Sequence, residues 1–362
     1  YYFVSLFGNL SNTMNRNHIQ FYILLFVVGL LVLLPFINTG VATGDDLSFL
    51  VSAVKNKLGE GRLGYAHTAG RFYFLVTLPF YRLPYVFDNL LIANGVNLAF
   101  VAIGVVLLGA IIKKLFCDKW MGLLAMVVFL AFLSIKGNWN PITNLRWYFT
   151  FTFDLLLLSF YLLLSYRNSN KRVHLIISVI SFAVALMFYE VYLLYLPLLI
   201  IFAVKPEVYR SEKKLLKKCL WVLRFSWPFL LVAFVYLSIY FGFRVLYPAT
   251  YAGTSFAPDL KIYQSYQAML RLARGSYPLY FIAENKMVFY EGSEKLFNHY
   301  STLKEFLLSI RALSLIKSFI VAFLFYYFLS KAKRSNIKAL LLIMFVAVLF
   351  IYFLHPPLSF LL

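Results

Sequence analysis

Acidic residues are scarce in this chain, and charged residues of both signs are few. Only 14 of the 362 residues are Asp or Glu, and charged residues make up 13% of the chain against 62% for hydrophobic residues. Soluble globular domains carry about 25% charged residues, so the composition excludes that class. The only cysteines, Cys117 and Cys219, each lie close to lysine. Two such thiols exclude a disulfide framework and a thiolate metal cluster.

The sequence motifs of several enzyme classes are also missing. The chain has no HExxH, Walker A or GxSxG motif and no GxGxxG in a strand–helix context. Zinc proteolysis, nucleotide hydrolysis, α/β-hydrolase chemistry and dinucleotide binding therefore lose their usual support. No internal repeat is apparent, which argues against a solenoid or an internally duplicated transporter. We expect any chemistry in the loops and helix ends between apolar runs.

Long apolar runs dominate what is present. A spanning helix needs about 20 predominantly apolar residues, so the expected fold class is all-α: a polytopic integral membrane helix bundle of about nine spanning helices, forming one unit over residues 1–362. The expected spans are residues 20–38, 89–112, 120–135, 148–166, 172–188, 190–204, 220–243, 314–330 and 337–354. Residues 72–87, interrupted by Arg82 and Pro84, are expected to form a re-entrant or interfacial helix on the outer face.

Lysine and arginine collect in short loops on one side of this topology. Membrane orientation and anionic lipids explain the net charge of +20 better than nucleic acid, which we do not expect as a partner. The basic loops lie near residues 113–119, 167–172, 205–218 and 331–334. By the positive-inside rule they face the cytoplasm. The outer side then receives the first outer loop, residues 39–88, and a large outer loop, residues 245–313.

Two adjacent carboxylates follow the first apolar run. Asp45 and Asp46 lie at the predicted membrane exit and begin a short amphipathic segment that continues to Leu58. Neighbouring like charges raise one pKa, which suits a general base that works near neutrality. The alternative is structural, with Asp46 as the N-cap and Asp45 at the positive end of a helix that lies along the membrane. We favour the catalytic interpretation, with either residue as the base.

Further along the first outer loop, His67 and Arg71 are candidates for binding a phosphate. If this segment is helical, the two residues lie one turn apart on the same face. Arginine can hold a phosphate with two parallel hydrogen bonds, which lysine cannot do with the same geometry. The alternatives are an interfacial arginine that reaches lipid headgroups and a histidine that is only a hydrogen-bonded neighbour.

Two further carboxylates, Asp154 and Glu190, lie at the outer ends of apolar spans. Ionisable residues at such depth are costly and usually face a cavity or a partner. Glu190 is the stronger candidate because it lies at a turn between two helices, on the same side as Asp45 and Asp46. A structural salt bridge to Arg71 or Arg146 is an equally good interpretation of Glu190.

Two outer loops have the composition of a substrate surface. Aromatic faces and side-chain amides suit the apolar faces and hydroxyl groups of a sugar, although an interfacial aromatic belt explains part of the pattern equally well. The candidates for sugar binding are Trp139, Asn140, Trp147 and Tyr148. In the large outer loop, Arg271 and Arg274 are candidates for recruiting an anionic lipid-linked substrate or a glycan, unless that loop only caps the bundle.

The order of these features resembles the first loop of GT-C superfamily glycosyltransferases. An outward Asp-Asp after the first span, a membrane-parallel helix and then Gly70-Arg71 are most similar to the loop of bacterial serotype-converting O-antigen glucosyltransferases. The resemblance covers about residues 20–90 and the general topology. It implies a polyprenyl-phosphate sugar donor, a lipid-linked glycan acceptor and a site on the periplasmic face of the bacterial inner membrane.

The resemblance also implies roles for particular residues. Asp45 or Asp46 would deprotonate the acceptor hydroxyl, and the transfer would invert the anomeric carbon. Arg71, together with Arg146, would neutralise the departing lipid phosphate. Some members of the superfamily use a divalent cation, and Mg²⁺ or Mn²⁺ would be held here by Asp45, Asp46 and Glu190.

Two other functions remain open at this stage. An O-antigen polymerase would also be basic, aromatic and polytopic, and its site would lie at Arg244, Arg271 and Arg274. A lipid-linked sugar transporter or flippase would instead bury Asp154 and Glu190 in a polar path through the membrane. The three functions differ in which of these residues are essential.

Overall fold

The chain is almost entirely helical wherever its structure is described. The computed structural model describes residues 16–38, 45–55, 61–87, 89–116, 118–132, 147–203, 215–248 and 250, with single helical positions between 312 and 327. The chain divides into two compact units, Tyr1–Thr254 and Ser255–Leu362, and the elements below belong to the first. No strand occurs among the described residues, in agreement with the predicted all-α fold class.

The first unit contains ten α-helices and three short 3₁₀ helices within its described residues. In chain order they are α2 (Arg16–Leu33), η1 (Leu34–Asn38), α3 (Asp45–Val54), α4 (Arg62–Ala69), α5 (Phe74–Arg82), η2 (Leu83–Tyr85), α6 (Leu90–Phe116), α7 (Lys119–Phe132), α8 (Tyr148–Ser169), α9 (Arg172–Phe188), η3 (Glu190–Tyr195), α10 (Leu196–Ala203) and α12 (Leu215–Leu246). Each span predicted between residues 20 and 243 coincides with a helix or with a 3₁₀ and α-helix in succession.

Three of these helices are long and apolar enough to cross a membrane by length and composition. They are Leu90–Phe116, Tyr148–Ser169 and the part Leu220–Leu246 of α12. The protein is therefore a helix bundle with the character of a membrane protein.

The predicted number of about nine spans is not confirmed. Helix α9 has 17 residues, which makes it about 25 Å long at 1.5 Å per residue, against about 30 Å for the hydrocarbon core of a bilayer. The prediction counted apolar runs, and some of these runs form helices too short to cross that core, such as α7 with 14 residues and α10 with 8 residues. The predicted spans 314–330 and 337–354 lie largely outside the described residues.

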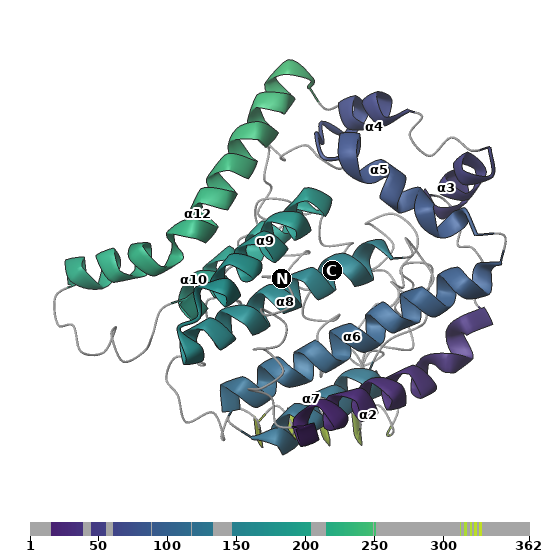
Figure 1. Ribbon diagram of the computed structural model, residues 1–362. Helices are drawn as coiled ribbons and strands as arrows, with labels where there is room; N and C mark the ends of the chain where they lie inside the picture. The colour runs from purple at the N-terminus through teal and green to yellow at the C-terminus, as the bar shows by residue number, and fades with distance from the viewer. Residues whose placement is uncertain are drawn as a thin grey trace, which may run out of the picture. The chain divides into compact units, whose positions relative to one another are not determined.

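Helix α8 lies between α6 and α9, and α6 also packs against α2 and α7 (Figure 1). Glycine allows close approach at two of these contacts, as small residues do in membrane helices. A Cβ at Gly122 of α7 would lie 2.5 Å from the carbonyl oxygen of Gly109 in α6. A Cβ at Gly104 of α6 would lie 2.6 Å from Oδ1 of Asp154 in α8. A larger residue at Gly122 would force α6 and α7 apart, whereas one at Gly104 would displace the Asp154 side chain.

One end of the helices is rich in lysine and arginine, and we call it the basic end. It is defined by Lys113 and Lys114 in the last turn of α6, Arg167 in the last turn of α8, and Lys119 and Arg172 at the starts of α7 and α9. Nζ of Lys114 donates a hydrogen bond of 2.8 Å to Oγ of Ser165 and so joins α6 to α8 at this end. The position of these residues agrees with the expected clustering of the basic loops on one side.

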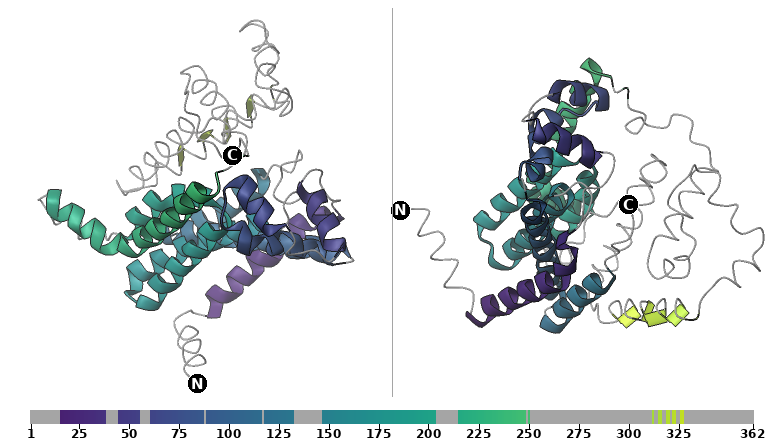
Figure 2. Two further views of the ribbon diagram at one scale, coloured as in Figure 1. Left: turned by 90° about the horizontal axis from the view of Figure 1, so that it is seen from above. Right: turned by 90° about the vertical axis from the view of Figure 1, so that its right-hand side faces the viewer.

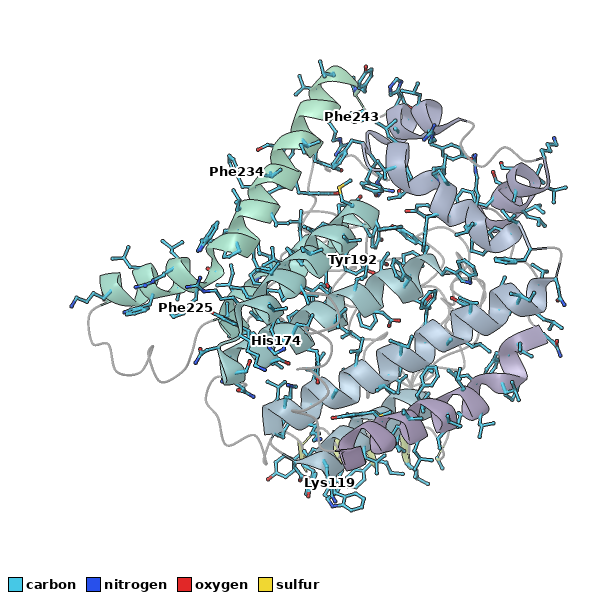
Figure 3. All side chains as sticks on the ribbon, viewed as in Figure 1. Lys119, His174, Tyr192, Phe225, Phe234 and Phe243 are labelled. Carbon is cyan, nitrogen blue, oxygen red and sulfur yellow. The ribbon has the colours of Figure 1, made fainter. Side chains whose placement is uncertain are left out.

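The opposite end carries the first outer loop. The Asn94 side chain at the start of α6 donates to the Ile37 carbonyl (2.7 Å). The short helices α3, α4 and α5 stay together in both views of Figure 2, and α4 lies next to the end of α12. In Figure 3, Phe243 marks that end of α12, and Lys119 marks the basic end.

Helix α12 bends within its length (Figure 1). The bend occurs around Pro228, because proline lacks an N–H and clashes with the carbonyl four residues earlier. Beyond the bend, Leu231 is 51% and Phe234 is 69% exposed, and Figure 3 shows Phe234 pointing away from the bundle. Such a face suits contact with lipid chains.

Candidate functional site

Helix α3, which begins with Asp45 and Asp46, is held against α5 by aromatic packing. The rings of Phe49 and Tyr81 lie 5.6 Å apart. These two residues belong to one buried cluster together with Ala53, Leu78, Tyr85 and Tyr148. The predicted helix after Asp45 is thus confirmed, although it ends at Val54 rather than Leu58. The side chains of Asp45 and Asp46 lie outside the described residues, so their predicted role as base stays a prediction.

Arg71 lies just beyond the end of α4. Gly70 adopts a left-handed conformation with φ of 61°, and its N–H donates to the His67 carbonyl (3.1 Å). The Arg71 N–H donates to the Ala66 carbonyl (2.9 Å), which completes the pair of bonds of a Schellman motif. The expected helical pairing of His67 with Arg71 is therefore wrong, because glycine ends the helix between them. In the Gly70-Arg71 pair, the glycine ends α4, and the backbone N–H of Arg71 fixes the arginine at that helix end.

Replacement of Gly70 by Ala is expected to lower the free energy of unfolding by about 1–2 kcal/mol, because a Cβ is disfavoured in the left-handed conformation. Gly70→Asn should cost less, since Asn tolerates that conformation better. Gly64→Ala in the middle of α4 is the control, because its Cβ would meet no atom within 4 Å. Thermal unfolding in detergent measures all three, and equal midpoints for Gly70→Ala and Gly64→Ala would contradict the assignment.

Arg71 forms an ion pair with Glu190. Nη2 of Arg71 lies 2.6 Å from Oε1 of Glu190, and the two side chains are 16% and 20% exposed. The hydroxyl of Tyr73 donates a hydrogen bond to the other carboxylate oxygen, Oε2. The salt bridge that was one of the two interpretations of Glu190 is thus confirmed. A direct role of Glu190 in substrate binding stays a prediction.

The surroundings keep both partners of Glu190 protonated. Burial by itself lowers the pKa of Arg71, but the neighbouring Tyr73 and Glu190 outweigh it, so the pKa is raised above its ordinary value. Burial, and then the charge of Glu190, raises the pKa of the Tyr73 hydroxyl well above its ordinary value. Tyr73 therefore remains a hydrogen-bond donor over the whole physiological pH range.

A break between two helices presents Glu190 to Arg71. Helix α9 ends at Phe188, Tyr189 is extended (φ −151°, ψ 116°), and Glu190 begins η3. The carbonyl of Phe188 accepts hydrogen bonds from the hydroxyls of Tyr148 and Tyr81, the latter at 3.4 Å. These two tyrosines stack on each other with ring centroids 4.1 Å apart. Tyrosines from α5 and α8 thus fix the helix end that precedes Glu190.

Aromatic residues of α12 form a wall beside α4 and Arg71. The ring of His67 stacks on Tyr247 at 4.0 Å and 11°, and Phe72 contacts Tyr236 at 5.4 Å. The Thr250 N–H donates to the Thr68 carbonyl (3.0 Å). The first residues of the large outer loop are therefore attached to the end of α4. The sequence analysis missed this wall, although its spacing at residues 236, 240, 243 and 247 is that of one helix face.

Three buried polar atoms near the ion pair have no hydrogen-bond partner within the part of the chain that the structure describes. They are Nε2 of His67, Nε of Arg71 and the hydroxyl oxygen of Tyr236. Buried polar atoms are almost always paired in native proteins. This group of unsatisfied atoms is therefore the feature of the site that most directly indicates a ligand.

Trp147 and Tyr148 are buried in helix packing. Trp147 is 7% exposed, its Nε1 donates to the Ala93 carbonyl (2.8 Å) and its backbone N–H to Oδ1 of Asn97 (3.0 Å). Tyr148 is 2% exposed. In this arrangement both anchor the start of α8, and their predicted contact with a sugar stays a prediction. The other predicted site residues, Trp139, Asn140, Arg146, Arg271 and Arg274, lie outside the described residues.

Asp154 lies against Gly104 in the α6–α8 contact and is 7% exposed. Its Oδ2 has no hydrogen-bond partner among the described residues. Asp154 is thus buried, as the transporter alternative requires. Glu190 is not, because it keeps 20% exposure beside the break between α9 and η3.

The described residues contain no group of three or more His, Cys, Asp or Glu side chains that could hold a metal ion. The Glu190 carboxylate is already bound by Arg71 and Tyr73, so it is a poor ligand for a cation in this arrangement. The predicted Mg²⁺ or Mn²⁺ site stays a prediction, because the side chains of its other two candidate ligands, Asp45 and Asp46, lie outside the described residues.

No protein-family model, curated protein or solved structure matches this chain. Function must therefore be argued from the side chains themselves. The arrangement offers a partly exposed guanidinium, a neutral tyrosine donor, further polar atoms without partners and a wall of aromatic rings. Such a site can bind an anionic group that is joined to an apolar or ring-shaped molecule.

Proposed function

We propose that this chain is a membrane glycosyltransferase that moves a hexose from a polyprenyl-phosphate donor to a lipid-linked glycan acceptor, with inversion at the anomeric carbon. In this proposal the bundle is GT-C-like and continues to about nine spans. The basic end faces the cytoplasm by the positive-inside rule. The opposite end, with Arg71 and Glu190, then lies on the periplasmic face of a bacterial inner membrane.

The observation that carries the proposal is the position of Arg71. Its backbone is fixed at the end of α4 and its side chain keeps 16% exposure. Helix α3, which begins with the two aspartates, packs against α5, the helix that follows Arg71. A base and a phosphate-binding cation are the two groups that direct transfer from a sugar phosphate requires, and both candidates belong to the same group of short helices.

In the proposed reaction, Asp45 or Asp46 accepts the proton of the acceptor hydroxyl. The hydroxyl oxygen attacks the anomeric carbon while the bond from that carbon to the phosphate oxygen breaks, and the configuration inverts because attack and departure occur on opposite faces. The electron pair of the broken bond leaves with the polyprenyl phosphate, whose negative charge is stabilised by Arg71. The Tyr73 hydroxyl, which stays protonated, is a neutral hydrogen-bond donor beside Arg71.

The N–H of Thr250, at the start of the large outer loop, donates a hydrogen bond to the Thr68 carbonyl in α4. In this proposal Arg271 and Arg274 of the same loop recruit the acceptor glycan. The polymerase alternative uses the same loop. The product of the reaction, rather than the position of the loop, must therefore distinguish the two functions.

The test is sugar transfer by the protein reconstituted in vesicles, with a panel of synthetic polyprenyl-phosphate hexoses and a lipid-linked oligosaccharide acceptor. Mass spectrometry of the glycolipid products should show the addition of single hexoses. Products longer by whole oligosaccharide units would identify a polymerase. Movement of the labelled donor across the membrane without a new glycosidic bond would identify a transporter, and either result would overturn the proposal.

A further inference from the structure

The guanidinium that we assign to the substrate phosphate already has an anionic partner. Arg71 and Glu190 are 2.6 Å apart, and both side chains reach the surface, with 16% and 20% exposure. A fully buried ion pair would be closed to competition, whereas this one can be approached by a second anion. The Glu190 carboxylate thus occupies a position on Arg71 that a phosphate oxygen would need.

The Glu190 carboxylate does not satisfy all the polar groups of this site. A guanidinium carries five N–H donors, and Nε of Arg71 is buried without a partner among the described residues. Nε2 of His67 and the Tyr236 hydroxyl oxygen are also buried without a hydrogen-bond partner among the described residues. A carboxylate has two oxygens, and a phosphate monoester has three that are free to accept. The surplus of polar groups fits a phosphate ester better than it fits Glu190.

Glu190 is also placed where its side chain can leave. It is the first residue of η3, directly after the extended Tyr189. Apart from the ion pair, the hydrogen bond from Tyr73 is the contact that holds its carboxylate among the described residues. Rotation of the Glu190 side chain away from Arg71 would leave the anchored end of α9 at Phe188 in place.

We propose that Glu190 is an internal counter-ion that stands in for the phosphate on Arg71 and is displaced when a phosphate ester binds. The assignment of that ester, a phosphate monoester, to the polyprenyl phosphate released in the reaction rests on the proposed function, while the exchange itself concerns anion binding alone. The affinity of the site for phosphate is then set by competition with Glu190. The positive charge of Arg71 is then balanced by Glu190 in the empty site and by the phosphate in the occupied site.

The experiment measures anion binding without sugar transfer. Isothermal titration of the detergent-solubilised full chain uses inorganic phosphate and geranyl phosphate, and nanodiscs with and without phosphatidylglycerol test the headgroup of a bulk lipid. Glu190→Gln should bind geranyl phosphate about tenfold more tightly than the native chain, as expected if Arg71 is free about a tenth of the time. Arg71→Gln should abolish binding. Asp118→Asn removes an exposed carboxylate at the basic end and should change nothing.

Unchanged or weaker binding by a folded Glu190→Gln would overturn the proposal. If that variant does not fold, Glu190→Asp decides, because the shorter side chain keeps the charge but weakens the ion pair with Arg71, and it should also tighten binding. Unchanged or weaker binding by a folded Glu190→Asp overturns the proposal as well. Preference for geranyl phosphate supports the released polyprenyl phosphate as the source of the phosphate, and preference for phosphatidylglycerol nanodiscs supports a lipid headgroup. If Glu190→Gln binds phosphate more tightly but the native chain transfers no sugar, the counter-ion proposal stands and the proposed function is overturned.

Discussion

Replacing Asp45 or Asp46 by Asn is expected to lower the rate of sugar transfer by roughly 10²–10⁴-fold for at least one of the two positions, the usual contribution of a general base. The loss should appear in kcat, with the KM for the donor little changed, because the base acts on the acceptor proton. Initial rates of sugar transfer at saturating donor, measured in reconstituted vesicles, give the change in kcat.

Folding should hardly change in these two variants. Asparagine caps a helix about as well as aspartate, and the lost interaction with the helix dipole is worth about 0.3–1 kcal/mol at the start of α3. Asp118→Asn is the matched control, since it removes the same charge at the basic end. Full activity in both Asp45→Asn and Asp46→Asn would remove the pair from the mechanism.

Arg71→Gln is expected to have two separable effects. Transfer should fall by about 10²–10³-fold, because the leaving phosphate loses the charge that stabilises it. The free energy of unfolding should also fall, by about 2–3 kcal/mol, since Glu190 is left with Tyr73 but without a cation; the usual cost of breaking a buried pair is somewhat larger, and the partial exposure reduces it. Arg71→Lys should lie between, because lysine keeps the charge without the forked donors.

The double variant Arg71→Gln/Glu190→Gln separates structure from chemistry. It removes both charges, so the thermal midpoint should return close to the native value while transfer stays low. Recovery of activity together with stability would mean that Arg71 serves only as the partner of Glu190. The four proteins of this cycle, measured for both unfolding and transfer, give the coupling between the two side chains directly.

The positions of the helices were predictable because they depend on local apolar length. Helix α9 occupies the predicted residues 172–188, and the turn predicted at Glu190 is the break before η3. The end of α4 was also within reach, since Gly70 followed by a new apolar segment is a usual helix stop. That glycine was instead interpreted as part of a Gly-Arg pattern, and the shared face of His67 and Arg71 was conditional on a helix that continues through Gly70.

The surroundings of Arg71 could not be predicted in the same way. Tyr73 and Glu190 are 117 positions apart along the chain, and no local periodicity connects them. The sequence analysis named the Arg71–Glu190 salt bridge only as one of two alternatives. The stacking of His67 on Tyr247 depends on the bend of α12 and on the packing of its neighbours, which local sequence patterns do not contain.

The hydrogen bond between Thr250 and Thr68 joins residues 182 positions apart, and this has a consequence for the order in which the protein is made. At about 5–20 residues per second, α12 leaves the ribosome roughly 10–40 s after α4. During that interval His67 and Arg71 have neither the rings of α12 nor, for most of it, the carboxylate of Glu190. The site is therefore completed only at a late stage of synthesis, and a chain that stops before α12 lacks the aromatic rings that pack against His67 and Phe72.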